Sequence, residues 1–259
     1  MQTRHHHDWQ TYDELLQKAA QWKQHLQQVK ETPPAPERTW YAHDIMASLW
    51  HLESLFRELP ASILDVFREG RIADIGGADG DLAFFMESMG LTVDLIDWPA
   101  TNWNGLAGAR ALKDRLDAQG VSIHEVDLDS QFNLPAEQYD MVFLLGILYH
   151  LKNPFYTLET LARHCRYCCL STRIARRTAD RKVELEAAPV SYLLDPHECN
   201  NDPTNFWIFS AAGLLRLADR TGWNVLADNR VGDTKRSDPS SDDHDERMFL
   251  VLESRQFGS

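Results

Sequence analysis

The chain has 259 residues, enough for one sizeable α/β core with a helical appendage, or at most for two small domains. Its formal net charge of −13 would repel a phosphate backbone, so long nucleic acid is a disfavoured partner. Apolar runs are too short to span a bilayer, the N-terminus lacks the apolar core of a signal peptide, and the four cysteines form no secreted disulfide pattern. We therefore expect a cytoplasmic protein with a small-molecule substrate and no membrane partner.

The first 62 residues are predicted to form a helical cap. Apolar residues recur at helical spacing over about 11–30, and this helix must end before the proline-rich stretch that follows it. Shorter helical patterns cover about 45–56 and 61–67. The domain boundary is therefore expected near residue 62, with residues 63–259 forming the main domain.

From Arg71 onward, short apolar runs alternate with helical stretches. The expected strands are 72–75, 92–96, 122–126, 141–145, 167–171, 223–226 and 248–253. The expected helices are 80–89, 105–119, 154–164 and 211–221. This alternation is typical of a parallel sheet with helices on both faces. The predicted fold class is α/β, with a Rossmann-like, mostly parallel seven-stranded sheet preceded by the helical cap.

The first of these strands runs into a glycine-rich turn and then a helix. Gly76, Gly77 and Gly80 let the backbone turn tightly and approach a ligand that a Cβ would block. The glycine spacing departs from that of a pyrophosphate-binding turn, and the surrounding acids would repel a pyrophosphate, so NAD is disfavoured. Carboxylates at this place suit a cationic ligand such as the ammonium and sulfonium of S-adenosylmethionine. The acids concerned are Asp74, Asp79 and Asp81.

The next two strands also end in carboxylates. Asp97 follows the second strand, where a carboxylate can accept both ribose hydroxyls of an adenosine. The alternative is that Asp97 begins a turn before Pro99. Asp127 follows the third strand, where an acid can accept the adenine amino group. The joint occurrence of these acids favours an adenosine site, because ligands bind outside the carboxyl ends of parallel strands.

With these motifs the chain resembles the class I S-adenosylmethionine-dependent methyltransferases. The resemblance rests on Asp74-x-Gly76-x-x-x-Gly80, on Asp97, on Asp127 and on the segment 139–143, and it covers about residues 70–172 well. It implies S-adenosylmethionine as cofactor and S-adenosylhomocysteine as product. It further implies that the first group of residues holds the methionine end, Asp97 the ribose and Asp127 the adenine. The cofactor-binding residues that we expect are Asp74, Gly76, Gly77, Gly80, Asp97, Trp98, Asp127, Leu128, Leu145 and Gly146.

A narrower resemblance follows the fourth strand. Residues 146–154 are similar to the corresponding segment of the tRNA wobble-uridine carboxymethyltransferase and of related uncharacterised methyltransferases. In that tRNA enzyme the tyrosine of the Leu-Tyr-His run helps to recognise an extra carboxylate on the cofactor. The matching upstream lysine segment is not found in this chain, so transfer of an ordinary methyl group is expected.

Tyr149 and His150 are the candidate catalytic residues. Methyl transfer is an in-line displacement in which alignment of the acceptor matters most. A hydroxyl acceptor also benefits from a general base, and histidine is the usual one near neutral pH. His150 is the candidate base and Tyr149 is a candidate for lining the methyl pocket. For both residues the alternative is ordinary packing or capping of the next helix.

The segment 190–207 interleaves amides, acids and aromatics with neither helical nor strand period. We interpret it as part of a substrate lid inserted at about 174–210, because its aromatic side chains would be costly to leave in water. The alternative is a turn-rich surface loop. The candidate substrate-binding residues are Tyr149, Arg173, His197, Glu198, Asn201, Asn205 and Trp207.

Other reactive or charged segments are given structural interpretations. Cys165, Cys168 and Cys169 are expected to be buried thiols and no metal site is predicted, because no second ligand pair has zinc spacing. The polar stretch 233–247 is interpreted as an exposed acidic loop. The basic segment 173–182 is interpreted as a solvated face, with a pocket for one phosphate as the alternative.

The sequence thus predicts a methyltransferase that acts on a small molecule, most plausibly at a hydroxyl oxygen. A tRNA-modifying (carboxy)methyltransferase and a catalytically silent S-adenosylmethionine-binding protein remain as alternatives. The methyl acceptor and the oligomeric state stay open.

Overall fold

The computed structural model describes residues 9–240 and 242–258. These residues form two compact units. The first contains the described residues through Asp127 together with Asn133–Phe143, and the second contains Leu128–Phe132 and the residues from Leu144 onward. Within the described ranges, no helix is long and apolar enough to cross a membrane.

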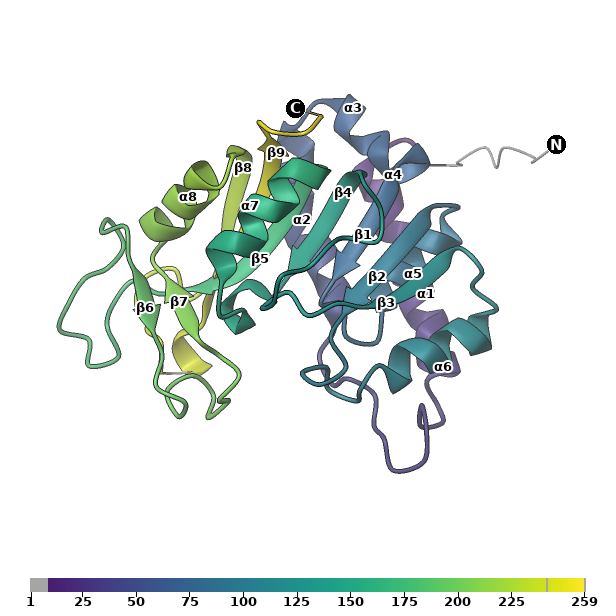
Figure 1. The fold of residues 1–259 in the computed structure, drawn as a ribbon, viewed down its shortest axis with the longest axis horizontal. Helices are drawn as coiled ribbons and strands as arrows, with labels where there is room; N and C mark the ends of the chain where they lie inside the picture. Colours follow the sequence, from purple (N-terminus) through teal and green to yellow (C-terminus); the bar gives the residue numbers. More distant parts are fainter. Residues whose placement is uncertain (1–8, 241, 259) are drawn as a thin grey trace. The chain divides into compact units, whose positions relative to one another are not determined.

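The N-terminal helices of the first unit agree with the expected pattern (Figure 1). Thr11 and Glu14 form a reciprocal capping box that fixes the start of α1. The ring of Tyr12 stacks on Phe56 with centroids 4.9 Å apart, and Phe67 meets Phe143 of the sheet at 5.9 Å. The helices therefore pack on one another and on the sheet of their own unit. They are α1 (Tyr12–Val29), α2 (Ser48–Glu58), α3 (Ala61–Leu64) and α4 (Val66–Glu69), with a 3-10 turn at Ile45–Ala47.

Parallel strands in the order β3-β2-β1-β4 make up the sheet of the first unit. The side chains of β1, β2 and β4 are almost continuously buried, as in strands covered on both faces, whereas β3 buries only Val121. Asp97 lies opposite Glu125 in the register, so the carboxyl ends of β2 and β3 share one edge. The elements are β1 (Arg71–Ile75), α5 (Asp81–Ser88), β2 (Thr92–Asp97), α6 (Ala107–Leu116), β3 (Val121–Glu125) and β4 (Tyr139–Leu145).

In the second unit, β9 lies between β5 and β8 and runs antiparallel to both. Trp223 is buried at the start of β8, and its indole Nε1 donates to the carbonyl of Leu158 in α7 at 3.0 Å. Cys165, Cys168 and Cys169 are buried in β5, as predicted. The elements are α7 (Pro154–His164), β5 (Cys165–Ile174), α8 (Ala211–Arg220), β8 (Trp223–Gly232) and β9 (Glu246–Ser254).

All seven expected strands and the α/β class are therefore confirmed, but the described residues contain two more strands. β6 (Ser191–Leu193) and β7 (Trp207–Phe209) pair antiparallel, and β7 joins β5 through Ile174 and Phe209. The segment at about 174–210, which the sequence predicts to be a lid and which we call the lid segment, is thus partly sheet. Its strands are three residues each, too short to display a period in the sequence.

The segment 233–247 is only in part the exposed loop that its composition predicts. Thr234, Lys235 and Arg236 are exposed. Ser237, Asp238 and Glu246 are fully buried. Glu246 accepts two hydrogen bonds from the guanidinium of Arg176, from Nε at 2.9 Å and from Nη2 at 2.8 Å. Acids can be buried here because their charges are paired with arginines that lie far away in the sequence.

The basic segment 173–182 is a solvated face only at its end. Arg173 is buried, whereas Arg181 and Lys182 are exposed. Its arginines are paired with acids of the same unit, which leaves little net charge for a phosphate. The pairs are Arg173 with Asp245, Arg176 with Glu186 and Glu246, Arg177 with Glu184, and Arg181 with Asp238.

Candidate functional site

A turn with three left-handed residues follows β1 in the first unit. We call residues 74–81 the cofactor loop. Gly76 and Gly80 have φ angles of 70° and 84°, and Ala78 has 52°. A Cβ at Gly77 would lie 2.4 Å from Oδ2 of Asp74. The glycines are thus required by the turn itself and by the close approach of the Asp74 carboxylate to the backbone.

Asp74 is buried, and its Oδ2 atom has no hydrogen-bond partner among the described residues. Burial, followed by the nearby charge of Asp97, raises the pKa of Asp74 to about 7. A buried acceptor without a donor is costly, so this atom calls for a ligand that donates a hydrogen bond or carries positive charge.

Asp97 lies at the tip of β2 as predicted. Its Oδ1 accepts the backbone N–H of Trp98 at 2.7 Å, and its Oδ2 accepts the amide of Asn102 at 2.8 Å. Burial raises the pKa of Asp97, and these two hydrogen bonds oppose the shift. Each carboxylate oxygen can accept a further hydrogen bond, as ribose hydroxyls require. Trp98 is 37% exposed beside it, and Asp127 is half-buried after β3.

The other two acids of the cofactor loop, Asp79 and Asp81, already have partners within the protein. Asp79 is buried and accepts hydrogen bonds from the backbone of Tyr41 and the side chain of Asn104, both at 2.8 Å. Asp81 forms an ion pair with Lys30 at 2.6 Å. Partners from the same unit therefore bind two of the three acids that the sequence placed around the loop, and Asp74 is the acid that stays available to a cationic ligand.

The chemistry of the remaining groups fits S-adenosylmethionine. Asp74 supplies one buried carboxylate oxygen, Oδ2, for an ammonium, and Asp97 supplies acceptors for vicinal hydroxyls. The left-handed turn at Gly76 and the missing Cβ at Gly77 let the Asp74 carboxylate lie against the backbone of the loop. A carboxylate-lined turn of this kind favours a cation over a pyrophosphate.

In the second unit, two groups lie near Gly146, which follows β4. A Cβ at Gly146 would lie 3.7 Å from Nη1 of Arg247 and 4.0 Å from the hydroxyl of Tyr149. The guanidinium of Arg247 also lies over the Tyr149 ring, 5.7 Å from its centroid. Leu145 is half-buried and Leu128 is buried in the same unit. Tyr149 therefore lies beside the guanidinium of Arg247, which also pairs with Asp245 at 3.6 Å.

His150 is held in one orientation by the lid segment. Its Nδ1 lies 3.1 Å from both the carbonyl oxygen and the hydroxyl of Thr204. A carbonyl oxygen only accepts, so Nδ1 carries the proton and Nε2 is the basic nitrogen. Burial lowers the pKa of His150, which keeps the imidazole neutral.

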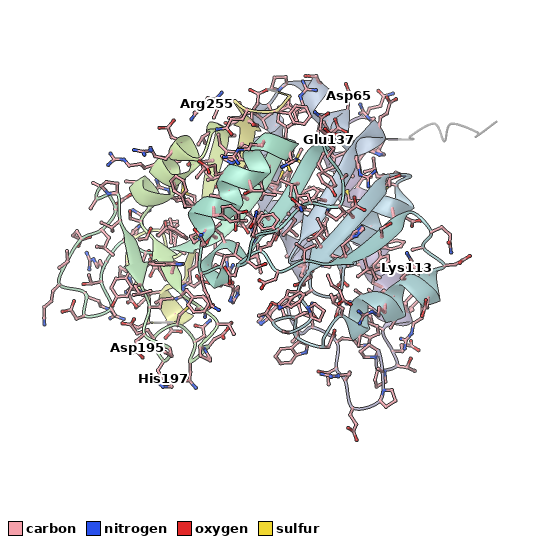
Figure 2. All side chains as sticks on the ribbon, in the orientation of Figure 1. Asp65, Lys113, Glu137, Asp195, His197 and Arg255 are labelled. Atoms are coloured by element: carbon pink, nitrogen blue, oxygen red, sulfur yellow. The ribbon has the colours of Figure 1, made fainter. Side chains whose placement is uncertain are left out.

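The remaining lid candidates fall into two groups. His197 and Asn201 are exposed, bond one another at 2.9 Å, and Figure 2 shows His197 with Asp195 at the outer tip of the segment between β6 and β7. Asn205 is buried and Trp207 is half-buried. Among the described atoms, Oδ1 of Asn205 and Nε1 of Trp207 are buried without a partner.

Glu198 accepts the hydroxyl of Tyr192 at 2.8 Å and the backbone N–H of Asp195 at 2.7 Å. Both of its carboxylate oxygens thus take hydrogen bonds within the lid segment. Glu198 thereby shapes the turn after β6.

Arg173 departs from the prediction. It lies inside β5, is 2% exposed, and its Nε pairs with Asp245 at 3.0 Å. Its Nη1 lies 2.9 Å from Sγ of Cys199. Strand β5 extends three residues beyond its expected end, so Arg173 is committed to the interior instead of to a substrate acid.

Three residues escape the sequence-based prediction. They are Lys30, which reaches the cofactor loop, Thr204, which orients His150, and Arg247, which lies beside Tyr149. Only Arg247 carried a local signal, since it is a charge at the start of an apolar strand. The other two act through contacts at long range in the sequence.

Comparison with known proteins places these features in a family. The profile of the methyltransferase domain family matches residues 49–228, which is more than half of the chain. The chain belongs to this family. It is a methyltransferase, and its cofactor is S-adenosylmethionine. No curated protein matches the sequence.

Solved structures of low sequence identity share the fold of this methyltransferase. The N-terminal domain of EvdMO1 with S-adenosylhomocysteine bound is 18% identical, with a TM-score of 0.56 over 75% of this chain and 79% of that chain. The same domain in the presence of S-adenosylhomocysteine and D-fucose is 15% identical, with a TM-score of 0.59 over 91% of this chain and 97% of that chain. An S-adenosylmethionine-dependent methyltransferase from Mesorhizobium loti is 16% identical, with a TM-score of 0.53 over 77% of this chain and 95% of that chain.

Proposed function

We propose that this methyltransferase transfers a methyl group to a hydroxyl oxygen of a small molecule, with His150 as general base. The observation that carries the proposal is the contact of Nδ1 of His150 with the carbonyl oxygen of Thr204 at 3.1 Å. This contact leaves Nε2 unprotonated and fixes the plane of the ring. A general base needs both properties before the acceptor arrives.

When bound, S-adenosylmethionine supplies a methyl group on a positively charged sulfur. His150 takes the acceptor's hydroxyl proton at Nε2, so that the oxygen can displace the neutral thioether. The lowered pKa of His150 keeps this nitrogen free of protons at neutral pH. Tyr149 and the neighbouring Arg247 orient the acceptor.

Each part of S-adenosylmethionine is assigned to its own group of residues. Asp74 binds the ammonium of the methionine end, and Asp97 binds the ribose hydroxyls. Asp127 with the backbone of Leu128 binds the adenine, and Trp98 lies beside the Asp97 carboxylate that binds the ribose. Gly76, Gly77 and Gly80 shape the turn that presents Asp74, and Leu145 and Gly146 contribute backbone beside the methyl group.

The acceptor is proposed to be a neutral or weakly charged hydroxylated compound. Asn205 and Trp207 each hold a buried polar atom without a partner in the described part of the chain, and both atoms can bond a hydroxyl. One similar structure, the N-terminal domain of EvdMO1, was crystallised in the presence of the sugar D-fucose. We place residues 174–210 in the role of substrate lid and retain the boundary near residue 62 as a proposal.

Modification of tRNA is the weaker candidate. The net charge is −13, and the arginines of the segment 173–182 are paired with acids. RNA binding needs cations that are free to meet phosphates. A catalytically silent binding protein would share every cofactor residue, so only turnover separates it from the enzyme.

The test is a screen of hydroxylated acceptors with S-adenosylhomocysteine release as the readout. We expect release with at least one acceptor, and we expect His150→Ala to abolish most of it while cofactor binding stays unchanged. Thr204→Val should lower the rate less, because it removes the hydroxyl but keeps the carbonyl. Release that is unaffected by His150→Ala would contradict the role of His150, and release only with tRNA would contradict the small-molecule acceptor.

A further inference from the structure

Lys30 connects the end of α1 to the cofactor loop of the first unit. It is the C-cap residue of the helix, and its ammonium lies 2.6 Å from Oδ1 of Asp81 and 3.3 Å from Oδ2 of Asp79. The Lys30 side chain is only 17% exposed, so these pairs are partly withdrawn from water. We call the segment that begins here, residues 30–41, the strap.

A second contact ties the far end of the strap to the same loop. The backbone N–H of Tyr41 donates to Oδ2 of Asp79 at 2.8 Å. The amide of Asn104 donates both to Oδ1 of Asp79 at 2.8 Å and to the strap carbonyl of Thr39 at 3.1 Å. Asp79 therefore joins the loop, the strap and the segment before α6 in one buried polar cluster.

The strap itself is fastened to α6. Arg115 donates to the carbonyls of Thr32 and Pro33 at 3.0 Å and 2.7 Å. The Trp40 ring lies between two cations, with Arg115 at 5.2 Å and Lys30 at 5.1 Å from its centroid. A displacement of the strap would therefore also displace Asp79 and Asp81 of the cofactor loop.

We propose that Lys30 is a positioning residue for S-adenosylmethionine binding, acting through Asp79 and Asp81 on the cofactor loop. Without the ammonium, two carboxylates would face one another in a partly buried place, and the loop would move to separate them. The loop also carries Asp74 and the left-handed turn at Gly76, so a shift would displace the groups that meet the cofactor. This inference goes beyond the proposed function and does not depend on which acceptor is used.

The first test measures S-adenosylhomocysteine binding by calorimetry on the full chain. We expect Lys30→Met to raise Kd about ten-fold, the loss expected for one charged hydrogen-bonding group. Lys30→Arg keeps the charge and should restore most of the affinity. Lys23→Met, on the same helix, removes the more exposed ion pair with Asp44 and should leave Kd unchanged.

A packing control separates positioning from general loosening of the helix. Leu26 is buried in α1, so Leu26→Ala weakens its packing but keeps Lys30. We expect Leu26→Ala to lower Tm at least as much as Lys30→Met while changing Kd far less. Equal effects of the two variants on Kd, or failure of Lys30→Arg to restore it, would overturn the proposal. If the wild type itself does not bind S-adenosylhomocysteine, the cofactor assignment is contradicted instead.

The second test uses hydrogen exchange at the Tyr41 amide, which donates to Asp79. If the strap holds the loop, the bound ligand must by reciprocity hold the strap. S-adenosylhomocysteine should slow exchange at Tyr41 in the wild type and in Lys23→Met, and much less in Lys30→Met. Unchanged exchange in the wild type at saturating ligand would overturn the proposal.

Discussion

The ring nitrogen Nδ1 of His150 lies 3.1 Å from the carbonyl oxygen of Thr204, across 54 positions of sequence. This contact gives the histidine after β4 a defined tautomer with a basic Nε2. It also makes the segment between β6 and β7 part of the candidate catalytic machinery, since that segment supplies the carbonyl.

His150 should titrate below the pH of an ordinary histidine. Burial lowers its pKa and outweighs the opposing effects of the Thr204 hydrogen bond and the Asp202 charge, and the Arg247 charge adds a smaller lowering. The Hε1 resonance of His150 in NMR spectra should therefore have its midpoint below about 6.5, the usual value. In Arg247→Met the midpoint should rise. A midpoint above the usual value would contradict the neutral base.

Asp74 should make the ligand-free protein lose stability as pH rises. Its pKa is about 7 in the folded chain and lower when unfolded, so between about pH 4 and pH 7 the folded state binds more protons. The contribution of Asp74 to the free energy of unfolding therefore falls as pH rises through this window. A pKa difference of roughly three between the folded and unfolded chain corresponds to a fall of up to about 4 kcal/mol.

Urea unfolding at a series of pH values checks this. The difference between the wild type and Asp74→Asn should change with pH between about 4 and 7 and be constant above it. Saturating S-adenosylhomocysteine should reduce the fall, because its ammonium stabilises the charged carboxylate. Parallel curves for the two proteins would contradict the raised pKa.

Glu246 should be among the acids most important for stability in the second unit. It is fully buried and bonds Arg176 and Ser237. Glu246→Ala would leave a guanidinium poorly paired in the interior, which costs about 3–5 kcal/mol. Glu184→Ala is the matched control, because the pair of Glu184 with Arg177 is more exposed. Equal losses in the two variants, measured by urea unfolding, would show that Glu246 is not structurally special.

Elements with local signals were predictable from the sequence. Helix α7 runs over Pro154–His164 as predicted, because Asn153 caps it and Pro154 suits its first turn. The end of β2 at Asp97 was also predictable from the change from apolar to polar residues. The acids at the strand ends followed from the strands themselves.

Features set by distant partners were not predictable. The hydrogen bond between Lys30 and Asp79 joins positions 49 apart, and the sequence around each residue does not predict it. The acids of 233–247 read as solvated because Arg176, which neutralises Glu246, lies 70 positions away. Charge pairing across the fold therefore decided which predicted site residues remain available to ligands.

The central claim is that the cofactor loop and Asp97 bind S-adenosylmethionine, and titration calorimetry with S-adenosylhomocysteine tests it most directly. The wild type should bind with measurable heat, and Asp97→Ala should weaken binding ten-fold or more, about the effect of losing two hydroxyl contacts. Glu125→Gln is the matched control, because Glu125 ends the neighbouring strand opposite Asp97 and pairs only at the surface with Arg110. Undiminished binding in Asp97→Ala, or no binding by the wild type at millimolar ligand, would contradict the claim.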